Sequence, residues 1–258
     1  MDKLNITIIQ PDIVWEKTSV NLNKYEKLFE KIEKSDMVVL PEMFHTGFTM
    51  NVEEFAQPMN GRVVSWMQNH ALEQNFAIMG STTIKDEEDI FNRFIMAMPC
   101  GTAIGADKRH LFRMGEEHKH FSPGTKQKIF QYFGWRIRPL VCYDLRFPVW
   151  SRNQNDYDLL IYVANWPAPR REVWKTLLKA RAIENQCYVI GVNRVGKDGM
   201  DIDYTGDSMV IDFKGNVIAE VAENTEGMAS VSLSLSELQQ FRDKFPAHLD
   251  ADKFEVKI

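Results

Sequence analysis

The stretch "DLLIYVANWPAPRREVWKTLLKARAIENQCYVIGVNRVG", residues 158–196, carries the strongest fold signal in the sequence. It begins with the apolar run "DLLIYVANW", which predicts a strand buried on both faces. An amphipathic run over residues 171–186 predicts a helix, and residues 187–196 predict another strand. A strand, a helix and a strand in succession are typical of an α/β protein with a central sheet.

The same alternation continues on both sides of this stretch. Strands are expected over residues 4–10, 37–40, 76–84, 90–99, 101–108 and 134–145, and helices over residues 20–34, 61–75 and 147–155. A hairpin is expected over residues 208–222, with its turn at residues 214–216. Because no linker or repeat divides the chain, we expect one α/β domain over residues 1–258, with a C-terminal extension at about 235–258.

The composition is that of an ordinary globular protein. The chain has 258 residues, of which 44% are hydrophobic and 26% are charged, and its net charge at pH 7 is -5. This charge disfavours binding to nucleic acid or to an anionic membrane. No segment approaches the roughly 20 apolar residues of a membrane span, and the N-terminus lacks the pattern of a signal peptide. We expect a cytoplasmic protein.

Metal sites and disulfides are not expected from the sequence. The three cysteines have spacings that fit neither a zinc site nor a disulfide framework; they are Cys100, Cys142 and Cys187. His118 and His120 form a His-x-His pair without a third ligand at a recognisable spacing. Each cysteine is therefore considered as a single thiol.

Four predicted strand ends carry chemically active residues. They are Glu42, Lys108, Cys142 and the pair Asn165-Trp166. Taken singly, each has an ordinary interpretation: a free cysteine is most often an inert core thiol, a buried glutamate is often an ion-pair partner, and a lysine is usually a surface charge. Function in layered α/β folds gathers where strands end and loops begin, so the coincidence predicts a site.

Three motifs, in this order, resemble the nitrilase superfamily of carbon-nitrogen hydrolases: "LPEMFHTGF", "DKRHLF" and "VCYDLRFP". The segments "YVANWPAPR" and "KARAIENQCYVIGVNRVG" are similar to its omega-amidase branch, also called 2-oxoglutaramate amidase. The resemblance runs from "ITIIQPDIVWEK" to "DFKGNVIAE" and covers most of the chain. It implies a four-layer α-β-β-α sandwich of two mixed sheets with outer helices, a homodimer, and a catalytic triad of Glu42, Lys108 and Cys142.

The resemblance also implies a second glutamate after the lysine, in a segment that leads to Phe-x-Pro-Gly. Here "EEHKHFSPG" supplies it, and the spacing to Phe121 and Pro123 selects Glu117 rather than Glu116. Glu117 would orient Lys108 or the bound amide. The rest of "CYDLRFP" recurs in family members that act on different substrates, so its charged residues are expected to hold the loop.

These residue types suit the hydrolysis of an amide through a thioester. A free thiol is only slightly ionised at neutral pH, so Cys142 needs a base and a cation nearby to act as the nucleophile. Glu42 would take the thiol proton and return it to the departing nitrogen. Lys108 and the backbone N–H of Tyr143 would stabilise the oxyanion. This chemistry requires no metal and no organic cofactor.

The resemblance predicts a substrate with a free carboxylate: 2-oxoglutaramate or 2-oxosuccinamate, cleaved to the dicarboxylate and ammonia. Arg170 and Arg171 are candidates to bind that carboxylate, although a solvated charge at a helix start is the more ordinary interpretation of each. Phe44 and Trp166 are expected to wall the pocket. A carbamoylase, a nitrilase and a catalytically inactive binding protein on the same scaffold are the alternatives.

Overall fold

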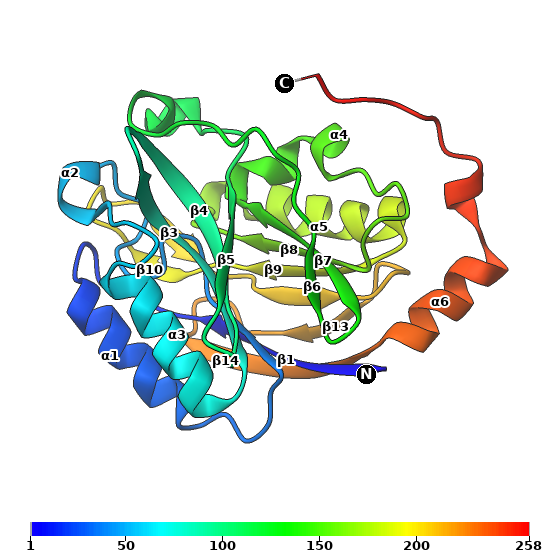
Figure 1. Ribbon diagram of the computed structural model, residues 1–258, viewed down its shortest axis with the longest axis horizontal. Helices are drawn as coiled ribbons and strands as arrows, with labels where there is room; N and C mark the ends of the chain where they lie inside the picture. Colours follow the sequence, from blue (N-terminus) through cyan, green and yellow to red (C-terminus); the bar gives the residue numbers. More distant parts are fainter. Residues whose placement is uncertain (1, 258) are drawn as a thin grey trace.

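Two six-stranded sheets face each other in the computed structural model, which describes residues 2–257 (Figure 1). The first sheet has the order β14-β1-β2-β3-β4-β5. Its strands are β1 Lys3–Gln10, β2 Met37–Val39, β3 Ala77–Asp86, β4 Asp89–Ala97, β5 Ala103–Asp107 and β14 Gly227–Ser234. β2 pairs in parallel with β1 and β3, while the other neighbours are antiparallel, so the sheet is mixed.

The second sheet has the order β13-β12-β9-β8-β7-β6 and is also mixed. Its strands are β6 Phe130–Tyr132, β7 Trp135–Val141, β8 Leu159–Val163, β9 Tyr188–Val192, β12 Met209–Ile211 and β13 Val217–Glu220. β7, β8 and β9 run in parallel, so their carboxyl ends meet at one edge. Cys142 and Asn165 follow β7 and β8 at that edge.

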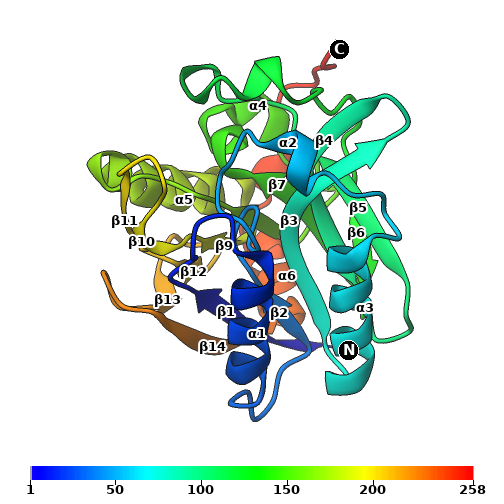
Figure 2. The same cartoon turned by 90° about the vertical axis from the view of Figure 1, so that its left-hand side faces the viewer.

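Helices cover the outer face of each sheet. α1 Thr18–Phe29 and α3 Arg62–Gln74 lie side by side outside the first sheet, as Figure 2 shows, and α5 Arg171–Asn185 packs on β9 and β12 of the second. The Trp66 ring of α3 joins the first two helices, with ring centroids 6.3 Å from Tyr25 and 5.6 Å from Phe29. The shorter helices are α2 Val52–Phe55, α4 Pro148–Ser151 and α6 Leu235–Lys244.

The apolar residues fill two packed layers that follow the predicted periodicity. Alternate residues of β1 point to opposite faces: Ile6 and Ile8 face the second sheet, and Ile9 faces α1 and α3. The layer between the sheets continues around β8, whose five residues are all buried, and on to α5. The predicted α-β-β-α sandwich is thus confirmed, with the two sheets as its inner layers.

The strand predicted over residues 134–145 is too long. β7 ends at Val141, and Cys142 begins a 3₁₀-helix, Cys142–Arg146. The cause is the backbone of Cys142, whose φ of 45° lies in the left-handed region and cannot continue a strand. The strand predicted over residues 187–196 is likewise divided, into β9 and β10 Val195–Lys197; β10 forms a separate hairpin with β11 Asp203–Thr205.

The turn predicted at residues 214–216 is confirmed, and Gly215 in it has a φ of 90°. β14 was not predicted; it forms an edge of the first sheet and pairs with β1 from Lys3↔Ser234 to Gln10↔Gly227. After β14, α6 and the 3₁₀-helix Ala247–Leu249 run along the outside of the molecule, in orange and red in Figure 1. Within residues 2–257, no helix is both long enough and apolar enough to cross a membrane.

Candidate active site

Cys142 is held at a sharp bend between β7 and the 3₁₀-helix Cys142–Arg146. Its side chain is buried, with 9% of its surface exposed, and Sγ lies 3.9 Å from the carbonyl oxygen of Asn165. The buried carboxylate of Asp144 holds the bend, because Oδ2 accepts the Val141 N–H at 3.0 Å and Oδ1 accepts the His110 N–H at 2.9 Å. The bend therefore presents the thiol at the carboxyl edge of the second sheet.

Glu42 and Lys108 follow strands of the first sheet and meet as a fully buried ion pair. Lys108 Nζ donates to Glu42 Oε1 at 2.8 Å. The backbone N–H of Asn165 donates to Glu42 Oε2 at 2.9 Å, and the Asn165 side chain donates to the Glu42 carbonyl oxygen at 2.6 Å. Asn165 therefore joins the carboxylate of the first sheet to the edge of the second sheet where Cys142 lies.

Glu117 joins this group from the 3₁₀-helix Glu117–Lys119. Its Oε1 accepts from Lys108 Nζ at 2.9 Å and its Oε2 accepts the backbone N–H of Phe112 at 2.6 Å. The neighbouring Glu116 is exposed and pairs instead with Lys119. The structure thus brings Glu117, and not Glu116, to the ammonium of Lys108.

The electrostatics keep the lysine charged and the thiol protonated. Burial alone would lower the pKa of Lys108, but the charges of Glu117 and Glu42 outweigh it and raise that pKa. Burial, and then the charge of Glu42, raise the pKa of Cys142 well above its ordinary value, while Lys108 acts in the opposite direction. Burial also raises the pKa of Glu117. The thiol must therefore lose its proton to a base at the moment of attack.

The aromatic residues of the predicted pocket lie in different places. Trp166 follows Asn165. The centroid of its ring lies 5.5 Å from the centroid of the Trp174 ring and 5.3 Å from the guanidinium carbon of Arg146. Phe44 instead lies in the layer between the first sheet and its helices, 5.6 Å from the Tyr25 ring. A strand end fixes where a residue lies but not which way its side chain points, and the Phe44 ring packs among the residues of this outer layer.

Two residues of the site were not predicted: Asn92, which lies outside the three motifs, and Phe48, which ends the first of them. Asn92 of β4 donates its Nδ2 to Glu42 Oε1 at 2.8 Å and to Glu117 Oε1 at 3.1 Å. The Lys108 ammonium nitrogen lies over the ring of Phe48, 5.2 Å from the ring centroid. One signal for Asn92 was available in the sequence. It is a polar residue inside the apolar strand "IFNRFIMAM", and the next strand, with which this one was expected to form a hairpin, ends at Lys108.

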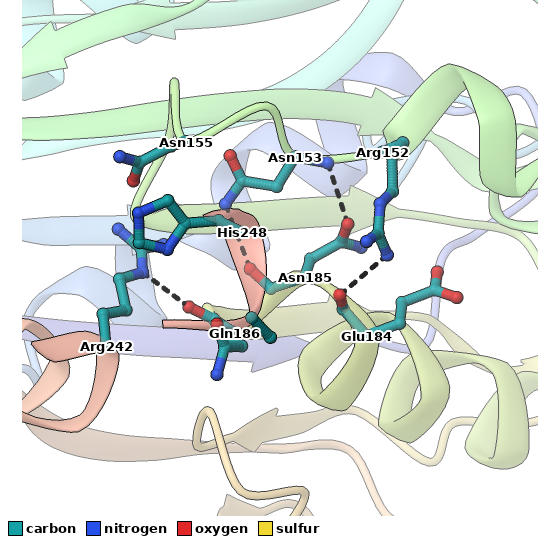
Figure 3. A pocket seen from close by; sticks show the side chains of 9 residues that line it. Arg152, Asn153, Asn155, Glu184, Asn185, Gln186, Arg242 and His248 are labelled. Carbon is teal, nitrogen blue, oxygen red and sulfur yellow. Dashed lines mark hydrogen bonds between the residues drawn. The ribbon is translucent and has the colours of Figure 1, made fainter. Parts of the chain in front are cut away.

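Away from this site, a small polar pocket lies beneath the C-terminal segment (Figure 3). Its lining residues bond to one another: the N–H of Asn153 donates to Asn185 at 2.8 Å, and Arg242 donates to the carbonyl oxygen of Gln186 at 2.9 Å. These residues precede β8 and β9 or belong to α6, so the pocket lies at the amino edge of the parallel strands, opposite Cys142. Among residues 2–257, no group of three His, Cys, Asp or Glu side chains could hold a metal ion.

Residues 5–243 match the family model described as carbon-nitrogen hydrolase. The chain belongs to the carbon-nitrogen hydrolase family. The omega-amidase YafV of Escherichia coli (strain K12) is 48% identical to this family member over 256 residues, which cover 99% of this chain and 100% of that protein. The 2-oxoglutaramate amidase of Bacillus subtilis (strain 168) is 35% identical over 257 residues, covering 97% and 98% of the two chains.

Among solved structures, XC1258 from Xanthomonas campestris superposes on this carbon-nitrogen hydrolase with a TM-score of 0.96 and 42% sequence identity, over 100% of both chains. That structure is described as a CN-hydrolase superfamily protein with an arsenic adduct in the active site. The predicted family and the predicted enzyme class are therefore confirmed: the chain is a hydrolase of carbon–nitrogen bonds other than peptide bonds.

Proposed function

We propose that this chain is an omega-amidase, which cleaves the terminal amide of 2-oxoglutaramate or 2-oxosuccinamate to the dicarboxylate and ammonia. The names of its relatives from E. coli and B. subtilis support this substrate class. The observation that carries the proposal is the buried group around Lys108, whose Nζ lies 2.8 Å from Glu42 and 2.9 Å from Glu117, joined through Asn165 to the edge that holds Cys142.

In the first half-reaction Cys142 attacks the amide carbon. Glu42 accepts the thiol proton as the Sγ–C bond forms, and the carbonyl π electrons move onto oxygen. Glu42 Oε1 accepts from both Lys108 and Asn92, whereas Oε2 accepts only from the backbone N–H of Asn165, so Oε2 is the oxygen with a lone pair left to serve as base. The Lys108 ammonium and the backbone N–H of Tyr143 stabilise the oxyanion; one such donor typically lowers the barrier by about 3 kcal/mol.

The tetrahedral intermediate then loses ammonia. Glu42 returns its proton to the nitrogen, the C–N bond breaks, and a thioester on Cys142 remains. Water attacks this thioester while Glu42 accepts one of its protons. The C–S bond breaks, the thiolate recovers that proton from Glu42, and the acid leaves. One carboxylate thus serves as base and acid in both halves, and Glu117 holds Lys108 in place throughout.

The free carboxylate of the substrate needs a cation, and the two arginine candidates differ in their partners. Arg171 is already paired with Asp207 at 2.7 Å and with Glu223. Arg170 is half-buried over the ring of Phe112, with its guanidinium carbon 5.5 Å from the centroid, and no carboxylate within residues 2–257 forms an ion pair with it. We therefore assign the substrate carboxylate to Arg170, with Trp166 as a wall of the pocket.

A substrate panel tests the proposed function. Purified enzyme is given omega-amido 2-oxo acids, N-carbamoyl amino acids and nitriles, and ammonia, carbon dioxide and the acid product are measured. We expect the highest kcat/KM for the omega-amides, with ammonia and dicarboxylate in equal amounts. Carbon dioxide from the carbamoyl compounds at a higher kcat/KM would indicate a carbamoylase, and turnover of nitriles alone a nitrilase. Binding without any product would indicate an inactive scaffold.

We further propose that residues 1–258 act as one catalytic domain, with residues 235–258 as its extension, and that the enzyme is a cytoplasmic homodimer. All three cysteines are free thiols, which suits a reducing compartment. Apolar side chains are exposed on α5 and along the C-terminal segment, namely Ile183, Phe245 and Leu249, and such surfaces are typical of subunit contacts. Light scattering that gives the mass of one chain, 30.0 kDa, would contradict the dimer.

A further inference from the structure

Asn92 lies at the centre of the charged group, and the mechanism described above uses only its hydrogen bond to Glu42 Oε1. It is fully buried in β4, and its side-chain amide donates to Glu42 Oε1 at 2.8 Å and to Glu117 Oε1 at 3.1 Å. Lys108 Nζ donates to the same two oxygens, at 2.8 and 2.9 Å. The four groups therefore form a closed ring in which two donors alternate with two acceptors.

The orientation of the Asn92 amide follows from this ring. Its Nδ2 faces both carboxylates, while its Oδ1 is buried and has no hydrogen-bond partner within the described residues. Turning the amide over would place Oδ1 against two carboxylate oxygens, which repels. The structure thus leaves a buried oxygen unsatisfied in order to give both carboxylates a donor, although unsatisfied buried oxygens are rare and costly.

The backbone of Asn92 fixes Lys108 as well. The carbonyl oxygen of Asn92 accepts the N–H of Lys108 at 3.0 Å, directly beyond the last β4–β5 pair, Arg93↔Asp107. One residue therefore sets the position of the lysine through its main chain and the positions of both glutamates through its side chain. Two of the three Lys108 ammonium hydrogens are used in the ring, which leaves one for the substrate oxyanion.

A neutral donor suits this place better than a charged one. The two glutamates and one lysine carry a net negative charge, and each carboxylate makes it harder for the other to ionise. A second cation would neutralise the base, and a third carboxylate would add repulsion. An amide supplies two N–H groups, which stabilise both ionised carboxylates and leave the charge of Glu42 available to accept a proton.

We propose that Asn92 is a positioning residue for the reaction: it holds the carboxylates of Glu42 and Glu117 in place on either side of Lys108, and by donating to Glu42 Oε1 it leaves Oε2 to face the thiol. This inference rests on the proposed role of Glu42 as the base. Its effect reaches the substrate only through Glu42 and Lys108, because Asn92 itself does not touch the reacting atoms.

The test is the pH profile of kcat/KM for Asn92→Leu, which keeps the shape of the side chain and removes its donors. We expect kcat to fall at least tenfold with KM changed less than threefold. The midpoint of the acid limb of the profile should move to higher pH by about one unit, because a carboxylate that loses a hydrogen-bond donor binds its proton more tightly. Asn92→Ser, which is smaller and cannot reach both carboxylates, should move the limb in the same direction.

Thr83→Val is the matched control. Thr83 pairs with Asn92 across β3 and β4, is equally buried, and has a hydroxyl without a partner among the described residues. Its replacement should leave the profile unchanged. A purely structural role of Asn92 would lower activity equally at every pH, and an unshifted acid limb in both Asn92 variants overturns the inference.

Glu42→Gln separates this inference from the proposed function. If Glu42→Gln abolishes turnover while both Asn92 variants keep the wild-type acid limb, Glu42 remains the base and only the inference about Asn92 fails. If Glu42→Gln keeps both turnover and the acid limb, the proposed mechanism itself fails, and the Asn92 inference fails with it.

Discussion

At the scale of single residues, the site depends on side chains that are buried but paired. Glu42, Lys108 and Glu117 are fully buried, and removing charges from water is favourable only when each finds close partners. Lys108 finds two carboxylates, and Asn165 provides a further donor to Glu42. Such pairing keeps the groups fixed before the substrate arrives, which lowers the reorganisation that catalysis requires.

Arg170 determines selectivity for the substrate carboxylate in this account. Arg170→Gln should lower kcat/KM for an omega-amido 2-oxo acid about 100-fold, because a charge-assisted hydrogen bond is lost. A neutral amide of the same length should lose much less, so the ratio of the two kcat/KM values is the quantity to measure. Arg171→Gln, at the residue already paired with Asp207, should leave that ratio unchanged. A wild-type ratio in Arg170→Gln would refute the assignment.

At the scale of the elements, the apolar periodicity located the helices and the central strands. The helix predicted over residues 171–186 is α5 Arg171–Asn185, because its buried side chains, among them Trp174 and Leu178, recur at helical spacing. β14 was missed although "ASVSLS" alternates apolar residues with serine, the pattern of a half-buried strand; its side chains are mostly small, and Leu233 alone among them is buried. Short apolar runs reveal buried strands better than half-exposed edge strands.

The motifs located the charged residues of the candidate site but not their surroundings. Glu42, Lys108 and Glu117, which the resemblance to the nitrilase superfamily pointed to, meet around the Lys108 ammonium. Asn92 was not predicted, because a single polar residue within a strand has no spacing pattern and its role depends on what lies opposite it in the fold. Phe44 was expected in the pocket but lies between the first sheet and its helices. Sequence order does not fix the direction of a side chain that follows a strand.

α6 is fixed to the sheet edge by one buried arginine. Arg242 donates to Asp158 at 2.9 Å and to the carbonyl oxygens of Tyr157 and Gln186 at 2.8 and 2.9 Å. Arg242→Met should lower the free energy of unfolding by about 3 kcal/mol, because these buried acceptors lose their donor. Urea unfolding measures this loss. The exposed Lys244 on the same helix is the control, and Lys244→Met should change stability by less than about 0.5 kcal/mol.

A loss below about 1 kcal/mol in Arg242→Met would mean that α6 is not held by this group. Turnover per folded molecule should stay close to wild type in the same variant, since Arg242 lies at the amino edge of the parallel strands and Cys142 at the carboxyl edge. A large loss of turnover at unchanged stability would contradict that separation.

At the scale of the whole molecule, two sheets hold one site between their edges, so its geometry depends on how the sheets are joined. The loop after β2 is fixed to the first sheet and to its helix α1. His45 in this loop is fully buried and hydrogen-bonds Thr18, the first residue of α1, at 3.0 Å and Thr82 of β3 at 2.7 Å. The same loop carries Glu42, so conditions that loosen it should affect both stability and the site.

His45 makes the stability of the molecule sensitive to acid. Burial lowers the pKa of His45 from 6.5 to about 3, and the charge of Arg62 adds to this effect. Between these two values the unfolded chain binds a proton that the folded protein does not, so stability decreases as pH falls. From pH 6.5 to pH 5 the loss from this residue should be about 2 kcal/mol.

Urea unfolding of the wild type and His45→Gln at pH 7 and pH 5 measures this contribution. The variant should be less stable at pH 7, because it loses the fit to Thr18 and Thr82, but it should lose about 2 kcal/mol less than the wild type on acidification. An equal loss in both proteins would show that other groups cause the acid sensitivity.

Ammonia release from an omega-amido 2-oxo acid by Cys142→Ala tests whether the Cys142 thiol forms the bond to the acyl carbon. Circular dichroism and the unfolding midpoint establish that the variant is folded. Its rate should fall by at least about 10⁴-fold, because the covalent path is removed. Ammonia release by the folded variant within about tenfold of wild type would contradict the account.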